Sequence, residues 1–256
     1  MKIAGFQMQS TVGDVEANLA KIDAGAGKAA AQGVRLLIAP ELALTGYGAG
    51  DLFPALASPA DGPLTQQLSQ IARRHGLTIV AGFAEKDGES VYNSAFLTDG
   101  KGQTATYRKS HLYGPYERQW FRPEAPSSVL ATIDGIRLGM LICYDVEFPE
   151  NVRRLAQAGA DLVVVPTALP SGWSGAFIAE HMIRVRAFEN QVFVAYVNHC
   201  GTDERFAYAG LSRIAAPDGG LLAEAPAESE ALIVAEIDPV AFQTSRSENT
   251  YLADLR

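Results

Sequence analysis

Short apolar runs rich in β-branched residues alternate with longer, alanine-rich segments in which apolar residues recur with a helical period. This pattern predicts strands over residues 2–8, 35–39, 77–83, 91–97, 104–107, 137–143, 161–165, 191–197, 210–214, 221–224 and 231–237. It predicts helices over residues 15–32, 64–74, 149–158 and 176–189. Strands that alternate with helices early and follow one another later indicate a layered α/β fold with mixed sheets.

The chain of 256 residues, 1–256, is predicted to form a single domain. We find no internal repeat, low-complexity tract or proline- and serine-rich linker that would mark a boundary. The longest stretch between predicted elements, residues 109–127, mixes aromatic, arginine, proline and glutamate residues without a period. A loop of that length in a compact chain is usually either functional or a misassigned element.

Composition and charge exclude some classes of function. The net charge of -8 argues against nucleic acid or an anionic membrane as the main partner, because both require clustered Lys and Arg. Two cysteines, Cys143 and Cys200, make neither a disulfide framework nor a metal site. The N-terminus lacks the apolar core of a signal peptide, and no apolar run reaches the ~18–20 residues of a membrane span. We therefore expect a soluble cytoplasmic protein.

Three predicted strands lead into polar residues suited to catalysis. Glu41, Lys109 and Cys143 end the segments RLLIAPE, TATYRK and RLGMLIC. Side chains beyond strand ends leave the core but stay on a rigid support, and ligands of α/β folds gather there. A carboxylate can take the proton of a thiol, and an ammonium can stabilise the oxyanion of an acyl intermediate. The amide N–H of Tyr144 is a second candidate oxyanion donor.

Taken singly, these residues have commoner structural explanations. A glutamate at a strand end is usually a surface or capping residue, a lysine a solvated charge, and a cysteine after an apolar run part of the core. The surrounding motifs favour catalysis, because APELALTGYG, YRKSHLYGPYE and LICYDVEFPE resemble the three signature blocks of the nitrilase superfamily of carbon–nitrogen hydrolases. DLVVVPTA resembles that family too, as does the segment after it that contains Arg184, Arg186, Glu189 and Asn190.

The resemblance extends over residues 1–237 and implies a four-layer α-β-β-α sandwich with mixed sheets. It implies the catalytic set Glu41, Lys109 and Cys143, with Glu117 as a second glutamate that hydrogen-bonds Lys109 or positions substrate. It implies neither a metal nor an organic cofactor. It also implies a homodimer or higher homo-oligomer formed through the face near the cysteine. We expect the weakly periodic segment 238–256 to contribute to the dimer contacts.

The residues after the cysteine bear on the substrate. Tyr144 and Asp145 stand where true nitrilases usually have Trp-Glu, which favours a carboxamide over a nitrile. Related enzymes that act on acid-bearing substrates often carry arginine at the positions of Val146 and Glu147. Our hypothesis is that Glu147 favours neutral or amine-bearing amides, as in aliphatic or 5-aminopentanamide-type amidases. The alternative is that Glu147 points to solvent or caps the next helix.

A substrate pocket is expected beside the signature blocks. Aromatic residues near these blocks are candidates for its walls, although such residues often only pack: Tyr47, Tyr113, Tyr116, Trp120 and Trp173. Thr167 and Ala168, just after Pro166, are better candidates because that strand end should face the same site. With Tyr144 and Glu147 they complete the predicted substrate-binding set.

Four other interpretations remain open at this point. A nitrilase or an N-carbamoyl hydrolase would share the fold and the catalytic set. A papain-like pair of Cys143 with His111 or His199 is a rival, although papain-like sequence around the cysteine is absent. A non-catalytic binding protein on the same fold is a third, and transfer of the acyl group to an amine a fourth. Cys200 is interpreted as a structural thiol.

Overall fold

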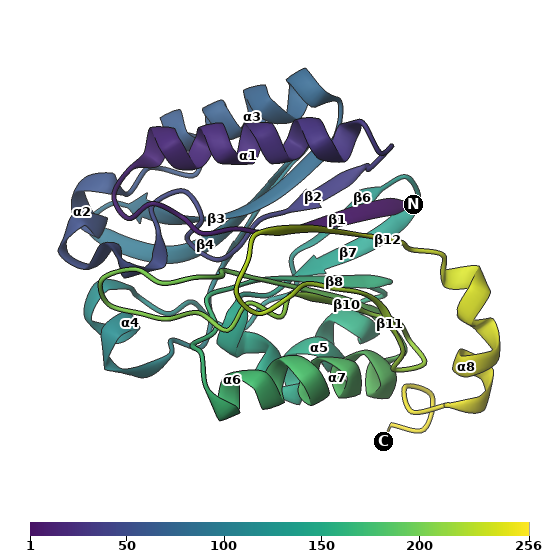
Figure 1. The fold of residues 1–256 in the computed structure, drawn as a ribbon. Coiled ribbons are helices and arrows are strands. Elements are labelled where there is room, and N and C mark those ends of the chain that lie inside the picture. Colours follow the sequence, from purple (N-terminus) through teal and green to yellow (C-terminus); the bar gives the residue numbers. More distant parts are fainter. Residues whose placement is uncertain (256) are drawn as a thin grey trace.

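Residues 1–255, which the computed structural model describes, form two six-stranded mixed sheets that pack face to face (Figure 1). The first sheet has the order β12 (Ala231–Glu236), β1 (Lys2–Gln7), β2 (Leu36–Ile38), β3 (Thr78–Asp87), β4 (Ser90–Thr98) and β5 (Thr104–Arg108). The second has the order β11 (Leu221–Glu224), β10 (Arg213–Ala215), β9 (Phe193–Asn198), β8 (Leu162–Thr167), β7 (Ile136–Met140) and β6 (Leu130–Ile133). In each sheet three neighbouring strands are parallel and the others are antiparallel.

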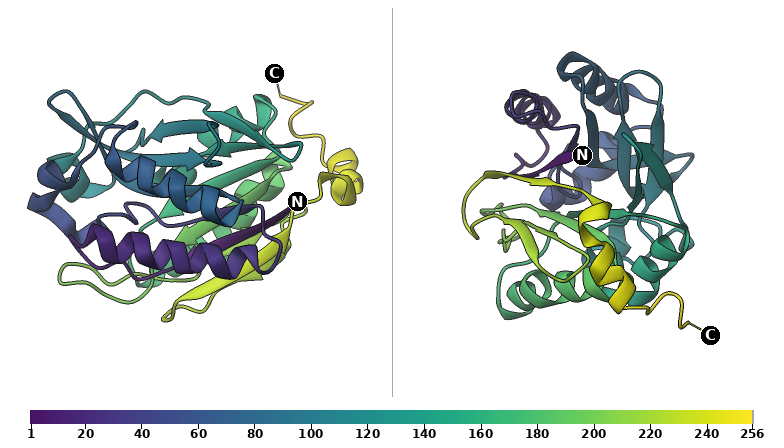
Figure 2. Two further views of the ribbon diagram at one scale, coloured as in Figure 1. Left: turned by 90° about the horizontal axis from the view of Figure 1, so that it is seen from above. Right: turned by 90° about the vertical axis from the view of Figure 1, so that its right-hand side faces the viewer.

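Helices cover the outer face of each sheet, as Figures 1 and 2 show. The first sheet carries α1 (Val15–Ala30) and α3 (Pro63–His75). The second carries α5 (Pro149–Gln157), α6 (Trp173–Phe177) and α7 (Ile183–Asn190), and a π-helical turn, Ile178–Met182, joins the last two. The predicted four-layer α-β-β-α sandwich is confirmed.

The central strands are continuously apolar because both of their faces are buried. In β2, Leu36 and Ile38 belong to the core cluster that is shared with the second sheet. Leu37, between them, belongs to the cluster formed with α1 and α3. Successive side chains of a strand point to opposite faces, so one strand supplies both layers of the core.

The carboxyl ends of both sheets meet at one edge of the sandwich. Met8, after β1, pairs in a parallel bridge with His199, after β9. In Figure 1 this edge lies towards the short helices α2 (Phe53–Leu56) and α4 (Gly114–Trp120). Loops that follow the parallel strands of the two sheets therefore converge there, so residues from both sheets can form one site.

The sequence pattern missed several elements. α4 lies inside the predicted loop 109–127, and β6 was not predicted. The helix predicted to begin at Ala176 begins at Trp173. A short helix, α8 (Gln243–Glu248), lies in the C-terminal segment, where hydrophobic periodicity is weak.

The C-terminal segment packs against its own chain. Phe242 contacts Phe193 of β9 with ring centroids 5.2 Å apart, and the hydroxyl of Ser245 donates to the side chain of Gln191 at 2.9 Å. Its contribution to a dimer stays a prediction. Within residues 1–255, no helix has the length and apolar character that crossing a membrane requires.

Candidate active site

The three catalytic residues predicted from the sequence lie in loops beyond strands of both sheets. Lys109 directly follows β5, whereas Glu41 and Cys143 stand further from the ends of β2 and β7. The strand predicted over 137–143 is too long, because β7 ends at Met140. Cys143 instead opens a 3₁₀ turn, Cys143–Glu147, that leads into α5.

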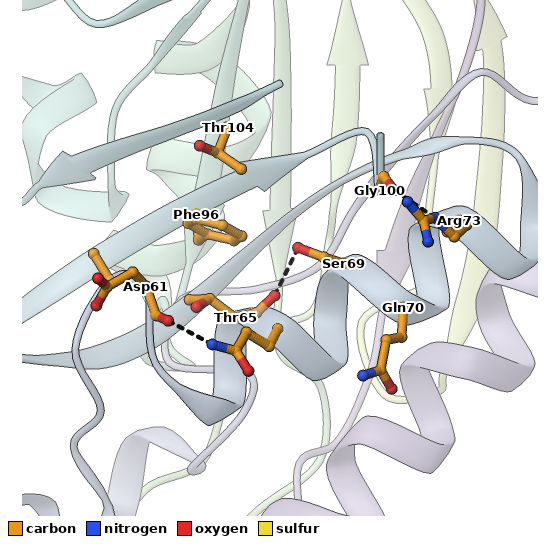
Figure 3. A pocket seen from close by; sticks show the side chains of 10 residues that line it. Asp61, Thr65, Ser69, Gln70, Arg73, Phe96, Gly100 and Thr104 are labelled. Carbon is orange, nitrogen blue, oxygen red and sulfur yellow. Dashed lines mark hydrogen bonds between the residues drawn. The ribbon is translucent and has the colours of Figure 1, made fainter. Parts of the chain in front are cut away.

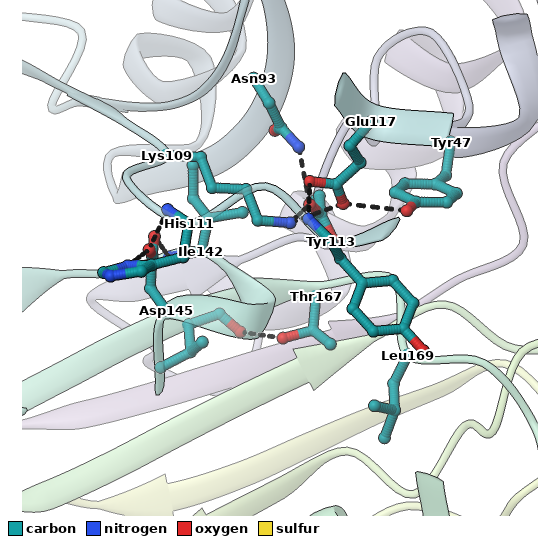
Figure 4. A network of polar contacts seen from close by, with 12 residues as sticks. Tyr47, Asn93, Lys109, His111, Tyr113, Glu117, Ile142, Asp145, Thr167 and Leu169 are labelled. Carbon is teal, nitrogen blue, oxygen red and sulfur yellow. Dashed lines mark hydrogen bonds and ion pairs between the residues drawn. The ribbon is translucent and has the colours of Figure 1, made fainter. Parts of the chain in front are cut away.

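A buried lysine pairs with two glutamates, Glu41 and Glu117; Figure 4 labels Lys109 and Glu117. Nζ of Lys109 lies 2.6 Å from Oε1 of Glu41 and 2.7 Å from Oε1 of Glu117, and all three side chains are fully buried. The hydroxyl of Tyr47 donates to the same oxygen of Glu117 at 2.9 Å, and the backbone N–H of Tyr113 donates to the other at 2.9 Å. Buried charges are tolerated when they are paired and hydrogen-bonded, so these contacts keep the cluster in place.

The charge of the lysine is secured by its two partners. Burial by itself lowers the pKa of Lys109, but Glu117 and Glu41 raise it well above its usual value. Burial raises the pKa of Glu117 to about 7, against the opposing effect of Lys109. Lys109 therefore keeps its positive charge beside the two carboxylates.

Glu41 keeps one carboxylate oxygen available for proton transfer. The side-chain N–H of Asn93 donates to Oε1 at 2.7 Å, the same oxygen that contacts Lys109. Oε2 is buried and has no hydrogen-bond partner among the described residues. An unpartnered buried oxygen is unfavourable and calls for a functional explanation. We assign it the role of proton acceptor. Asn93 was not among the predicted site residues, because a polar residue inside a strand carries no local mark of function.

Cys143 is held in a strained conformation. Its φ of 44° lies in the left-handed region, which costs a non-glycine residue on the order of 1–3 kcal/mol. The backbone amide of Ala168 lowers the pKa of its thiol. Burial raises the pKa of the thiol well above its usual range, Glu41 raises it further, and Lys109 lowers it. The thiol is thus protonated at neutral pH and needs a base at the moment of attack.

The two histidines considered as partners of the cysteine are engaged elsewhere. Nε2 of His199 lies 2.7 Å from the carbonyl oxygen of Glu41, Nδ1 lies 3.3 Å from that of Met8, and burial lowers the pKa of the ring. Nδ1 of His111 lies 2.9 Å from Oδ1 of Asp145. The structure therefore favours Glu41 over a histidine as the base.

An open cavity of about 510 Å³ reaches the nucleophile. It is lined by Tyr113, Cys143, Tyr144, Glu147, Leu169, Pro170, Ser171, Gly172, Trp173, Ser174, Gly175 and Ile178. Four predicted substrate-binding residues are in this set: Tyr113, Tyr144, Glu147 and Trp173. The lining residues Leu169 to Gly172 were not predicted, although they directly follow the predicted residues Thr167 and Ala168.

The other predicted pocket residues lie around the catalytic cluster. Tyr47 and Tyr116 are not among the lining residues; their rings pack together, and the hydroxyl of Tyr116 donates to the carbonyl of Tyr47 at 2.8 Å. Trp120 packs in the same cluster as these two rings. Thr167 is buried and its hydroxyl donates to the carbonyl of Val165, and the backbone amide of Ala168 lowers the pKa of the Cys143 thiol. Their roles in binding substrate stay predictions.

Glu147 presents an unpaired carboxylate to the cavity. The side chain is half-buried, and within residues 1–255 it forms no hydrogen bond or ion pair. Burial raises its pKa to about 7, while Lys109 and Arg186 lower it. The capping alternative finds no support, because α5 has no side-chain cap and Phe148 occupies the capping position.

A second cavity, between α3 and β4, lies apart from this chemistry (Figure 3). Its polar side chains bind neighbouring groups: the hydroxyl of Ser69 donates to the carbonyl of Thr65 at 2.8 Å, and Nε of Arg73 donates to that of Gly100 at 2.9 Å. We assign no reaction to it.

The carbon-nitrogen hydrolase family model matches residues 2–246. This chain belongs to the carbon–nitrogen hydrolase family. The hydrolase is 43% identical over 260 residues to the "Hydrolase in pqqF 5'region" of Pseudomonas protegens, with 100% of this chain and 89% of the relative covered. It is 36% identical to an (R)-stereoselective amidase of a Pseudomonas species, with 100% and 92% covered.

Solved structures of a related amidase resemble this chain, and one of them has a covalent adduct at its active site cysteine. An amidase from Nesterenkonia sp. AN1 has a TM-score of 0.89 and 34% sequence identity, with 100% of this chain and 96% of that one covered. In a glutamate-to-glutamine variant of that amidase, the acetamide moiety of fluoroacetamide is added covalently at the active site cysteine. These relatives confirm the amidase branch of the nitrilase superfamily. The protein is an enzyme that acts on amides, not a silent binding protein.

Proposed function

We propose that this hydrolase converts small aliphatic or amino-substituted carboxamides, of the 5-aminopentanamide type, to the carboxylic acid and ammonia. The observation that supports this substrate class is the unpaired carboxylate of Glu147, which lines the same cavity as Cys143. An ammonium group on the substrate would pair with this carboxylate, whereas an acid-bearing substrate would be repelled by it. The cavity volume of about 510 Å³ suits a short chain.

The proposed acylation step uses the groups of this cluster. Oε2 of Glu41 accepts the thiol proton of Cys143 while the sulfur attacks the amide carbonyl carbon. The ammonium of Lys109 and the N–H of Tyr144 stabilise the oxyanion that forms. When the tetrahedral intermediate collapses, the carbon–nitrogen bond breaks and Glu41 gives the proton to the departing nitrogen. Ammonia leaves, and a thioester on the sulfur remains.

Deacylation reuses the same groups. Glu41 accepts a proton from water, and the resulting hydroxide attacks the thioester carbonyl. Lys109 and the Tyr144 N–H again hold the oxyanion, and the carbon–sulfur bond breaks. Glu41 returns its proton to the sulfur of Cys143, and the acid leaves. Glu117 acts through Lys109, which it keeps charged and in place at 2.7 Å.

The substrate preference is the direct test of this assignment. We expect kcat/KM for 5-aminopentanamide to exceed that for glutaramate by roughly 10- to 100-fold, because an attraction is replaced by a repulsion at a half-buried carboxylate. Glu147→Gln should bring the two values close together and leave neutral valeramide unchanged. The rate of ammonia release gives kcat/KM for each of the three amides. A preference of the unmodified enzyme for glutaramate would contradict the proposal.

The preference for the amine should also depend on pH. With the pKa of Glu147 raised to about 7, its carboxylate is charged above that pH and neutral below it. The ratio of kcat/KM for 5-aminopentanamide to that for valeramide should therefore fall as the pH is lowered through about 7. Titrations of the shared catalytic groups cancel in this ratio. In Glu147→Gln the ratio should be flat, and a flat ratio in the unmodified enzyme would show that Glu147 does not contact the amine.

A further inference from the structure

A buried carboxylate outside the catalytic set collects hydrogen bonds from two distant segments (Figure 4). Oδ2 of Asp145 accepts from the hydroxyl of Tyr107 at 2.9 Å and from the backbone N–H of Ile142 at 3.3 Å. Oδ1 accepts from the backbone N–H of His111 at 2.9 Å and faces Nδ1 of the same ring at 2.9 Å. Three of these contacts, from the Tyr107 hydroxyl and the backbone N–H groups of Ile142 and His111, donate to oxygens that only accept when ionised.

These contacts bracket two catalytic residues. Tyr107 and His111 stand on either side of Lys109 in the chain, and Ile142 directly precedes Cys143. Lys109 follows a strand of the first sheet, whereas Cys143 follows a strand of the second. The single carboxylate therefore ties the two loops across the boundary between the sheets.

We propose that Asp145 is a positioning residue that sets the separation between Lys109 and Cys143. This inference deepens the mechanism proposed above and rests on it. The side chain is fully buried and is absent from the cavity lining, so it does not touch substrate. Its effect comes from geometry, because a displacement of about 1 Å between reacting groups can cost about 10²-fold in rate.

The other end of the same turn is held independently. Nε of Arg186, in α7, donates to the carbonyl of Val146 at 2.8 Å, and Nη2 donates to that of Glu147 at 2.7 Å. With Asp145 at one end and Arg186 at the other, the turn that begins at Cys143 is fixed at both ends. A fixed turn keeps the strained φ of Cys143, and with it the direction of the Tyr144 N–H.

Asp145→Asn tests the proposal, since it keeps the shape and replaces one accepting oxygen with a donor. We expect kcat per active site to fall by about 100-fold, with KM changed less than about threefold. The concentration of folded enzyme is taken from its cooperative urea unfolding, because an unfolded chain also exposes Cys143 to alkylation. The shape of the pH profile should stay the same, because Asp145 transfers no proton. Alkylation of Cys143 by iodoacetamide, which needs no substrate, should slow by about tenfold.

Gln191→Glu is the matched control. This buried side chain donates to the carbonyls of Phe188 and Pro217 at 2.7 and 3.0 Å, next to the amino end of β9 and away from the site. Gln191→Glu should lower the free energy of unfolding but leave kcat per active site and the rate of Cys143 alkylation unchanged. Tyr107→Phe, which removes one donor, should give a smaller loss of kcat, and adding it to Asp145→Asn should cost little more.

The proposal is wrong if Asp145→Asn keeps both kcat per active site and the alkylation rate within about twofold of the unmodified enzyme. If Asp145→Asn does not fold, the same criterion is applied to Tyr107→Phe. If the unmodified enzyme releases no ammonia from the amides tested, the proposed substrate class fails instead. The alkylation rates still decide the role of Asp145 in that case.

Discussion

Cys143→Ala should lower ammonia release from 5-aminopentanamide and valeramide by roughly 10⁴-fold or more, because it removes the thiol that forms the thioester in the proposed mechanism. Glu41, Lys109 and Glu117 keep their mutual contacts in this variant, so the loss is one of chemistry and not of the cluster. Mass spectrometry should also find no adduct at this position after treatment with fluoroacetamide. Residual turnover within about 100-fold of the unmodified enzyme would mean that the thioester is not obligatory.

A second substitution at the same position separates strain from chemistry. Cys143→Gly should be as inactive as Cys143→Ala, yet more stable than it by about 0.5–1 kcal/mol. The φ of 44° is unfavourable for alanine by about 1–2 kcal/mol and costs glycine nothing, and the greater freedom of glycine in the unfolded chain offsets part of that gain. Urea unfolding of the two variants measures the difference. A glycine variant less stable than the alanine variant would argue against the strained turn.

The layers of the fold follow from the sequence because each central strand is buried on both faces. Such strands are continuously apolar, as in β2 and β8, and strong local patterns of this kind are readable without a structure. α4 was missed because seven residues are too few for a helical period to show. Its one local signal was the proline at its first turn, Pro115, which follows a glycine in the YGPYE segment.

The site was predictable as a set of residues but not as a geometry. Glu41, Lys109 and Cys143 could be chosen from strand-end positions and motif resemblance. Asn93 could not, because it reaches Glu41 only through the pairing of β4 between β3 and β5. The strained φ of Cys143 could not be predicted either. The apolar run before the cysteine looks like a strand up to that residue, whereas β7 ends at Met140. Long-range pairing and backbone strain leave no local signature.

Lys109→Met should be the most destabilising change in the site as well as an inactivating one. It leaves the carboxylates of Glu41 and Glu117 buried without their cation, and loss of one partner of a buried ion pair costs about 3–5 kcal/mol. The oxyanion also loses its charged partner, which should lower kcat by a further factor of about 10²–10³ among folded molecules. Urea unfolding at neutral pH measures the first effect, and ammonia release the second.

The stability penalty of Lys109→Met should shrink at low pH, and this identifies its cause. Lys109 lowers the pKa of Glu117, which burial raises to about 7, so removing Lys109 raises that pKa further above the ~4.3 of an unfolded chain. Between those two values the folded variant binds a proton that the unfolded chain lacks, so its stability falls as pH rises through this window. We expect a smaller penalty at about pH 5 than at about pH 8. The exposed Lys101→Met should show no penalty at either pH. An equal penalty for Lys109→Met at both would mean that lost packing, and not uncompensated buried charge, destabilises the variant.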